Sequence, residues 1–469
     1  MAKLELKALT AFQQAIHTSE TGEIESQFAN KFDSVLWNTQ IPCKFKCTQD
    51  EDDLIFTTNP TFHYLMYSWL RQKLPSIRVK KDNKHPVQIC WCHNVCNNII
   101  ISAEARSDDN KFQSFDNFWC DMYPQWYTKP GFKDHFNMCV GNNPILEQWT
   151  DFLPSLPVKA VQPWFYSKDT SAAFPIFYCS SQTSIVHRYK MKRKIVDLLR
   201  MRIDEGKGWK EIKPNLKYVE GYGTNILPIP QLWGRYAFVT PDEVDYYKTC
   251  EGQKERVYYI EDVIACEATN PSVYGSKVDI QLHCDTPCKG VFWVAENLTA
   301  SNVNNFSNYT TNSSDLFKGW SPIKNYCIMY GSQPRTDIME SDQTEIEPWF
   351  HFPSAPWEPG YHVYSYAHSS ASVRSDVGVV LSNLGARLLL TISNMDPYSN
   401  IEAETEETED ITQDDGESPK IEEQPGKGIE HDPTDVSEDK FMVHVRLLVM
   451  KKLVIAQGEE GKFVFREDK

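Results

Sequence analysis

The chain has 469 residues, of which 41% are hydrophobic and 13% aromatic, and its formal net charge is −16. This length exceeds what one hydrophobic core usually supports, so it predicts two domains, and the apolar content excludes a largely disordered protein. The charge is concentrated in residues 401–440, where sixteen Asp and Glu stand against three Lys and Arg, a balance of −13 that leaves only −3 for the rest. Because the remainder is nearly neutral, no broad basic face is available and we expect no direct contact with nucleic acid.

The first thirty residues predict an N-terminal arm (residues 1–30). A short helical pattern over residues 4–12 has no clear N-cap, so we expect it to order only against another surface. The start lacks the apolar core of a signal peptide, and no stretch approaches the ~20 apolar residues needed to cross a bilayer. We therefore expect a soluble protein made in the cytosol, where the thirteen cysteines remain free thiols.

Short runs rich in β-branched and aromatic residues alternate with Gly- and Pro-containing turns along most of the chain, which is typical of antiparallel β-sheet. The clearest runs are 54–58, 88–92, 98–102, 184–189, 234–239, 256–260, 278–283, 290–294, 386–392 and 441–449. Residues 203–232 have little regular pattern and many turn residues, so they predict a boundary between a first domain (31–215) and a second (216–469). Two successive sets of about eight strands suit a pair of β-sandwiches.

The acidic segment, residues 396–439, lies between two strong strand patterns. Its carboxylates repel one another and it contains almost nothing to bury, so we expect a disordered insertion between paired strands. A docking loop for a basic partner is the alternative.

Four segments resemble one family. Residues 59–70 read Asn-Pro-Thr-Phe-His-Tyr-Leu-Met-Tyr-Ser-Trp-Leu, residues 118–142 run from Phe-Trp-Cys-Asp-Met-Tyr to Met-Cys-Val-Gly-Asn, and residues 163–166 are Pro-Trp-Phe-Tyr. The most specific segment, residues 348–367, joins Pro-Trp-Phe-His-Phe to Gly-Tyr-His-Val-Tyr-Ser-Tyr-Ala. Their order and spacing resemble the major capsid proteins of nucleocytoplasmic large DNA viruses, especially the iridovirus and marseillevirus type, from about residue 35 onward. Residues 368–378 depart from the family pattern, which leaves open a divergent minor capsid or scaffold paralogue.

This resemblance implies an all-β double jelly roll, two tandem eight-stranded antiparallel sandwiches with long loop insertions. It further implies a homotrimer with a pseudo-hexagonal outline that contacts neighbouring capsomers and minor capsid or penton proteins. The N-terminal arm would then touch those proteins or an internal viral membrane. The protein would be located in the virion after assembly in the host cytoplasm. Aromatic residues near the most specific segment are candidates for subunit interfaces, with the sandwich core as the alternative; they are Trp349, Trp357, Tyr361 and Tyr364.

Four N-glycosylation sequons fall within one Asn- and Ser-rich stretch, at Asn297, Asn305, Asn308 and Asn312. A cytosolic protein does not meet the secretory glycosylation enzymes, so we interpret the stretch as an exposed hydrophilic loop that forms an outward tower. Glycans on these asparagines are the alternative.

The remaining motifs point to structure more than to chemistry. Residues 90–96 contain three cysteines and His93, but strand alternation places Cys90 and Cys92 opposite His93, so buried free thiols are favoured over zinc. Cys284 and Cys288 flank a Pro-containing turn that we interpret as a surface loop. The basic residues at 188–202 could face lipid or internal proteins, or pair with neighbouring carboxylates. No catalytic motif is present, so we expect no enzyme activity and no cofactor or metal; a carbohydrate-binding or hydrolytic β-sandwich is the competing class.

Overall fold

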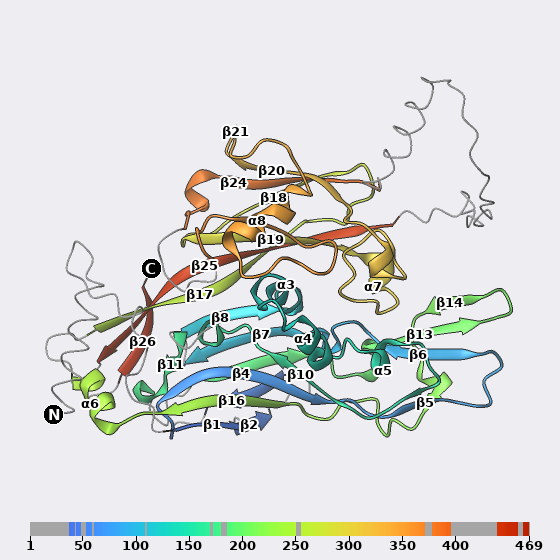
Figure 1. The fold of residues 1–469 in the computed structure, drawn as a ribbon, viewed down its shortest axis with the longest axis horizontal. Helices are drawn as coiled ribbons and strands as arrows, with labels where there is room; N and C mark the ends of the chain where they lie inside the picture. The colour runs from blue at the N-terminus through green and yellow to red at the C-terminus, as the bar shows by residue number, and fades with distance from the viewer. Residues whose placement is uncertain are drawn as a thin grey trace, which may run out of the picture.

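The computed structural model describes residues 37–42, 44–47, 53–58, 61–107, 110–168, 172–179, 185–249, 255–370, 378–394, 439–457 and 463–468. The N-terminal arm (1–30) and most of the acidic insertion (396–439) lie outside these residues. Within them the chain forms two stacked β-sandwiches (Figure 1), and every recorded strand pairing is antiparallel. No helix among these residues is long and apolar enough to cross a membrane.

The first sandwich consists of two five-stranded sheets. One has the order β1-β16-β4-β10, with β11 also paired to β4, and the other has the order β2-β3-β12-β7-β8. The strands of the first sheet are β1 (Trp37–Pro42), β4 (Tyr64–Lys73), β10 (Pro157–Val161), β11 (Phe174–Pro175) and β16 (Gln231–Phe238). Those of the second are β2 (Lys44–Cys47), β3 (Asp53–Thr57), β7 (Ile100–Ser107), β8 (Asn110–Asp116) and β12 (Val186–Met191).

Two small sheets extend the first sandwich at the end drawn on the right of Figure 1. Their orders are β14-β13-β6 and β15-β5-β9. These strands are β5 (Ile77–Val79), β6 (Val87–Trp91), β9 (Phe152–Leu153), β13 (Leu199–Asp204), β14 (Trp209–Ile212) and β15 (Val219–Glu220).

The second sandwich also has two five-stranded sheets. The inner one has the order β17-β25-β19-β23, with β26 on β25, and the outer one has the order β18-β24-β20-β21, with β22 on β20. The inner strands are β17 (Glu255–Glu267), β19 (Cys288–Asn297), β23 (His362–Ser365), β25 (Phe441–Gln457) and β26 (Phe463–Asp468). The outer ones are β18 (Lys277–Gln281), β20 (Ile323–Tyr330), β21 (Gln333–Pro334), β22 (Met339–Glu340) and β24 (Ala386–Ile392).

Strand β16 differs from the expectation, because the sequence places it at the start of the second half. It pairs with β1 and β4 in register across Gln231↔Arg71 and Trp37↔Phe238, which makes it part of the first sandwich. The turn-rich segment before β16 thus also belongs to the first sandwich, and it contains the short strands β14 and β15. The second sandwich takes its first strand only at β17.

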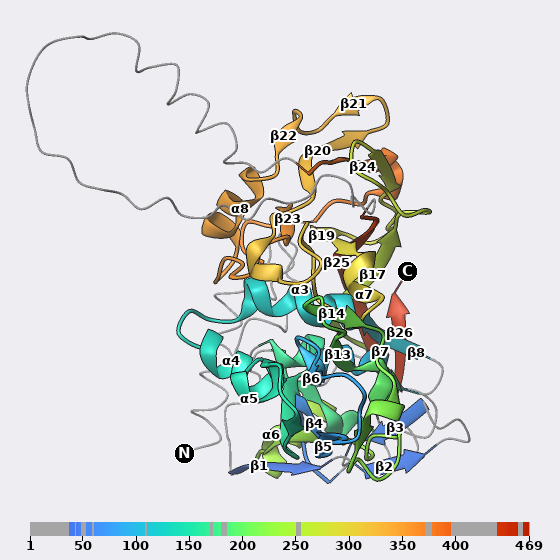
Figure 2. The same cartoon turned by 90° about the vertical axis from the view of Figure 1, so that its right-hand side faces the viewer.

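The inner sheet of the second sandwich is buried on both faces. Strand β19 is buried at nine of its ten positions, whereas β24 alternates buried and half-buried residues, as expected of a sheet with one solvated face. One face of the inner sheet packs on the outer sheet, and the other joins the core of the first sandwich through Phe292, Val363 and Leu448. In both views this sheet lies between the first sandwich and the outer sheet (Figures 1 and 2).

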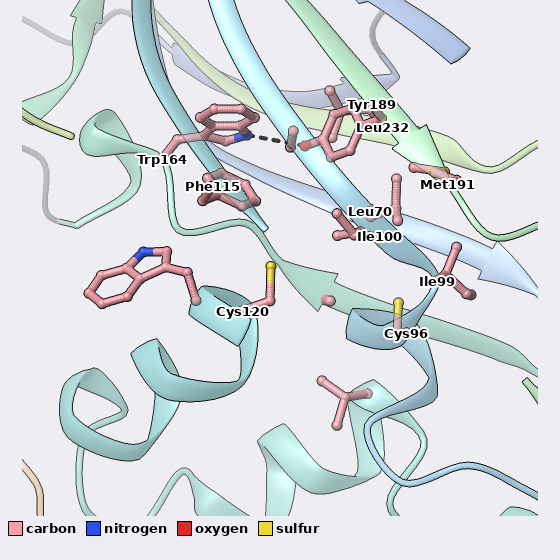
Figure 3. Packing of buried hydrophobic residues seen from close by; sticks show 14 of the residues in the cluster. Leu70, Cys96, Ile99, Ile100, Phe115, Cys120, Trp164, Tyr189, Met191 and Leu232 are labelled. Carbon is pink, nitrogen blue, oxygen red and sulfur yellow. Dashed lines mark hydrogen bonds between the residues drawn. The ribbon is translucent and has the colours of Figure 1, made fainter. Parts of the chain in front are cut away.

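Aromatic side chains fill the interior of the first sandwich (Figure 3). Trp164 is 1% exposed, and its Nε1 donates a hydrogen bond to the hydroxyl of Tyr189 at 3.2 Å, so burying the indole leaves no unpaired donor. Phe115 packs against the same indole, with ring centroids 4.4 Å apart.

The α-helices are short and lie in loops between strands. They are α2 (Val95–Asn98), α3 (Asn117–Tyr127), α4 (Lys133–Val140), α5 (Pro144–Glu147), α6 (Pro241–Thr249), α7 (Leu298–Ser301) and α8 (Gln343–His351). Helices α4 and α8 come from different sandwiches but lie on the same side of the molecule, at the left of Figure 2.

Candidate subunit-contact surface

A buried ion triplet joins the two sandwiches of one chain. Glu261 on β17 accepts from Lys168 of the first sandwich at 2.8 Å and from Lys289 on β19 at 2.6 Å. All three side chains are at most 7% exposed. Burial alone would raise the pKa of Glu261, but the two ammonium groups outweigh it and hold this pKa below its ordinary value. The carboxylate is therefore charged, and its charge is compensated from both sandwiches.

A second ion cluster lies along β25. The Arg446 guanidinium, 1% exposed, pairs with Asp116 at the end of β8 and with Glu267 on β17, the latter at 3.2 Å. Asp116 also caps helix α3, because its Oδ1 accepts from the backbone N–H of Trp119 at 3.0 Å. The same residue thus begins a helix of the first sandwich and anchors a strand of the second.

His93 forms a third link between the sandwiches. Its Nδ1 lies 2.6 Å from Glu147 Oε1 and its Nε2 lies 3.0 Å from Glu358 Oε1, where Glu358 belongs to the loop after α8. Burial by itself lowers the pKa of His93, but the two carboxylates prevail and raise it to about 10. The imidazole is therefore a cation that donates from both nitrogens. Gln125 of α3 completes the group by donating from Nε2 to Glu358 Oε2 at 3.1 Å.

The stretch with the four sequons does not form the expected exposed tower. Ser307 and Tyr309 donate hydrogen bonds to Asp121 Oδ2 of α3 at 2.5 and 3.0 Å. Asn304 Nδ2 donates to the backbone oxygens of Val196 and Leu199 at 2.6 and 2.9 Å. Burial raises the pKa of Asp121 to about 6 although both hydroxyls favour its charged form. The loop is polar because it packs on polar groups of the first sandwich.

The sequon asparagines organise this loop. Asn297, Asn305 and Asn308 are at most 1% exposed, and Asn312 is half-buried. Asn297 Oδ1 accepts from the N–H of Ala300 at the start of α7 at 3.1 Å. The Nδ2 groups of Asn297, Asn305 and Asn308 donate to backbone oxygens at 2.7–3.0 Å, so the atom that would carry a glycan is occupied.

Exposed apolar side chains lie just before α4, on α4 and on α8. They are Phe132 (58% exposed), Met138 (60%), Ile346 (50%), Trp349 (82%) and Phe350 (72%), and we call them the helical face. Both helices lie on one side of the molecule (Figure 2). Large apolar groups exposed on the same side of a molecule are candidates for a contact surface.

The other three interface candidates lie elsewhere. Tyr361 is 5% exposed and packs edge-on against the rings of Trp126 and Tyr309, so it contributes to the contact between the two sandwiches of one chain. Trp357 is half-buried against Phe136 of α4, and Tyr364 is half-buried over the core of the second sandwich. Of the four candidates, only Trp349 belongs to the helical face.

The structure explains why the motif at residues 348–367 contains a glycine at position 360. Gly360 has φ +89°, and a Cβ at this position would collide with the backbone oxygen of Tyr309. The close approach of the two loops therefore requires glycine there.

The cysteine-rich segment is part of the core. Cys90, Cys92 and Cys96 are at most 1% exposed free thiols, and burial raises the pKa of Cys90 and of Cys92 to about 12. Among the described residues, no group of three or more His, Cys, Asp and Glu side chains is arranged to hold a metal ion. Cys284 and Cys288 are also at most 1% exposed, so the surface loop expected there is wrong for these two side chains.

Several residues of the basic run pair with neighbours. Arg188 contacts Asp53 at 2.6 Å, Arg200 contacts Glu211 at 2.9 Å, and the Lys192 ammonium lies 3.8 Å from the ring centroid of Phe306. For Arg188 and Arg200 the structure favours pairing with neighbouring carboxylates, whereas Lys192 lies over an aromatic ring.

The chain is similar to viral capsid proteins in sequence and in structure. The family model for the large eukaryotic DNA virus major capsid protein matches residues 249–414. The major capsid proteins of Lymphocystis disease virus 1 (isolate Darai) and Invertebrate iridescent virus 6 are each 25% identical to it, and each match covers 65% of this chain and 68% of the relative. The solved Faustovirus major capsid protein matches with a TM-score of 0.65 at 8% identity, covering 90% of this chain and 91% of that chain. The quasi-atomic model of the PBCV-1 virus capsid matches with a TM-score of 0.62 at 12% identity, covering 92% and 97%.

Together, the paired sandwiches and these structural likenesses define the class as a mostly β, double jelly-roll protein. The expected eight strands per jelly roll remain a prediction. The family model and the viral relatives then show that the chain is similar to the major capsid proteins of large eukaryotic DNA viruses. Its function is that of a structural capsid subunit.

Proposed function

We propose that the chain assembles into a homotrimeric, pseudo-hexagonal capsomer, and that the helical face is its main contact with a second copy. In a cyclic trimer each contact is heterologous, so the helical face of one subunit packs on a different surface of the next. The capsomers then tile a shell through contacts with neighbouring capsomers.

The observation that carries this proposal is the exposure of Trp349 (82%) and Phe350 (72%) on one helix. Aromatic residues dominate the binding energy of stable protein interfaces when they are buried there, and two such rings in water have no role in the fold of a single chain. The helix that carries them is held in place, because α8 packs against β23 of the buried inner sheet.

The remaining expectations concern parts or partners beyond one subunit. The N-terminal arm would contact minor capsid or penton proteins or an internal membrane, and the protein would be assembled in the host cytoplasm.

The test is the mass in solution of the recombinant protein and of the double variant Trp349→Glu, Phe350→Glu, measured by light scattering. We expect wild type at three times 54.2 kDa and the double variant at 54.2 kDa. Two buried charges in place of aromatic anchors should weaken association by at least about a hundredfold.

Ile229→Glu provides a matched control, because Ile229 is an exposed apolar residue (47%) in the loop before β16 and outside the helical face. We expect this variant to remain a trimer. A monomeric wild type, or a trimeric double variant with native circular dichroism, would contradict the proposed contact.

A further inference from the structure

A hollow of about 460 Å³ opens where the two sandwiches meet at the end of the molecule that faces the viewer in Figure 2. Strands β6, β13 and β14 of the first sandwich form one wall, and the loop around Asn305 to Phe317 of the second forms the other. We call it the end hollow; none of its lining residues belongs to α4 or α8. Its volume is in the range of small-molecule sites, roughly 300–1,000 Å³.

Aromatic rings are presented at the rim of the end hollow. Trp209 on β14 is 43% exposed and Phe317 is 67% exposed, and they come from the two opposite walls. Trp149 also lines the end hollow and is half-buried. Arg202 holds these indoles in place, because its guanidinium carbon lies 4.8 Å from the ring centroid of Trp149 and 4.7 Å from that of Trp209. The apolar surface is therefore positioned before any ligand binds.

The charged groups of the end hollow largely neutralise one another. Arg200 donates from one terminal nitrogen to both oxygens of Glu211 at 2.9 Å, and protonated His93 pairs with Glu147 in the wall. Arg202 donates to the neutral amide oxygen of Gln88, and Asp315 accepts from the N–H of Phe317 at 3.1 Å. With three cations and three carboxylates among the lining side chains, the site offers donors and acceptors without a strong net charge.

We infer that the end hollow is a carbohydrate-binding site for a neutral sugar. A pyranose ring has an apolar face of C–H bonds that stacks on an aromatic ring and an edge of hydroxyls that both donate and accept. Trp209 and Phe317 supply the stacking surfaces, while Glu211, Asp315 and Arg202 supply partners for hydroxyls. A phosphate or another compact anion gains little here, because carboxylates already occupy Arg200 and His93 and would repel it.

Saturation-transfer NMR on the intact recombinant protein tests this inference. The probes are the methyl glycosides of glucose, galactose, mannose, N-acetylglucosamine and fucose, with N-acetylneuraminic acid and inorganic phosphate as anionic comparators. We expect transfer to at least one neutral glycoside that phosphate does not displace. Trp209→Ala and Phe317→Ala should each weaken that binding by about tenfold, as the loss of one stacking surface implies.

Trp320→Ala is the matched control, because Trp320 is an exposed tryptophan (37%) that does not line the end hollow. We expect it to leave binding unchanged. Absence of transfer to every neutral glycoside, binding of the anionic probes alone, or binding that survives both ring deletions would each overturn the inference. Light scattering on the same samples keeps this outcome separate from the proposed capsomer, because none of these variants touches the helical face.

Discussion

The contact between the two sandwiches differs in chemistry from the helical face: the first contains buried ion pairs, and the second consists of exposed apolar side chains. Between the sandwiches, buried charges meet partners from the other half of the chain: Glu261 with Lys168, Arg446 with Asp116, and His93 with Glu358. On the helical face, Trp349 and Phe350 are exposed and apolar. The charges between the sandwiches are paired within one chain, whereas the apolar side chains of the helical face are buried only when another surface covers them.

This difference indicates that the two contacts have different roles: one fixes the arrangement of the sandwiches within a subunit, and the other joins subunits. Removing one partner of a buried ion pair leaves an uncompensated charge, so the sandwiches have few alternative arrangements in which every charge is paired. An apolar surface instead gains free energy with any complementary partner of suitable shape. We therefore expect substitutions in the contact between the two sandwiches to change the free energy of unfolding, and substitutions in the helical face to change the oligomeric mass.

The largest effect is expected for Glu261→Gln. The substitution removes the buried charge that pairs with both Lys168 and Lys289, which should lower the free energy of unfolding by about 3–5 kcal/mol. Chemical denaturation followed by fluorescence measures the loss.

Asp279→Asn is the control for this variant. It breaks the pair between Asp279 and Arg387 at 2.8 Å, whose side chains are 50% and 38% exposed, so the expected loss is at most about 1 kcal/mol. Equal losses of unfolding free energy for the two variants would contradict the view that buried charge stabilises the contact between the two sandwiches.

An effect that depends on pH is expected for His93. Its pKa rises from 6.5 to about 10 in the folded chain, so protonation stabilises the fold fully below pH 6.5, and this stabilisation is lost as the pH rises through 10. Wild type should therefore lose stability over this range by more than His93→Gln, whose side chain does not titrate. Denaturation midpoints at pH 6 and pH 10 for both proteins give the difference, and parallel changes would show that His93 carries no shifted proton.

The all-β class and most strand positions could be predicted from the sequence, because β-branched and aromatic runs between turns are a local signal. The partner of β16 could not, since its pairing with β4 joins residues about 160 positions apart. Composition alone predicts that the sequon loop faces solvent. Asn297, Asn305 and Asn308 are instead buried with paired amides, a state that depends on the facing surface and leaves no local signal.

The same limit holds for the buried contacts. The sequence groups His93 with the neighbouring cysteines, whereas its partners Glu147 and Glu358 lie 54 and 265 residues away. Trp349 and Tyr361 belong to one motif and look alike as interface candidates, but a helix presents the first to solvent and the second points into the contact between sandwiches. The end hollow combines residues of both sandwiches and has no continuous motif.

The most direct test of the central claim is a reconstruction of the recombinant capsomer by electron cryo-microscopy. We predict three copies around a threefold axis, with α8 and α4 of each covered by a neighbouring copy and the two sandwiches of each chain packed as they are here. A trimer in which Trp349 and Phe350 face solvent would contradict the assignment of the helical face as the contact between subunits.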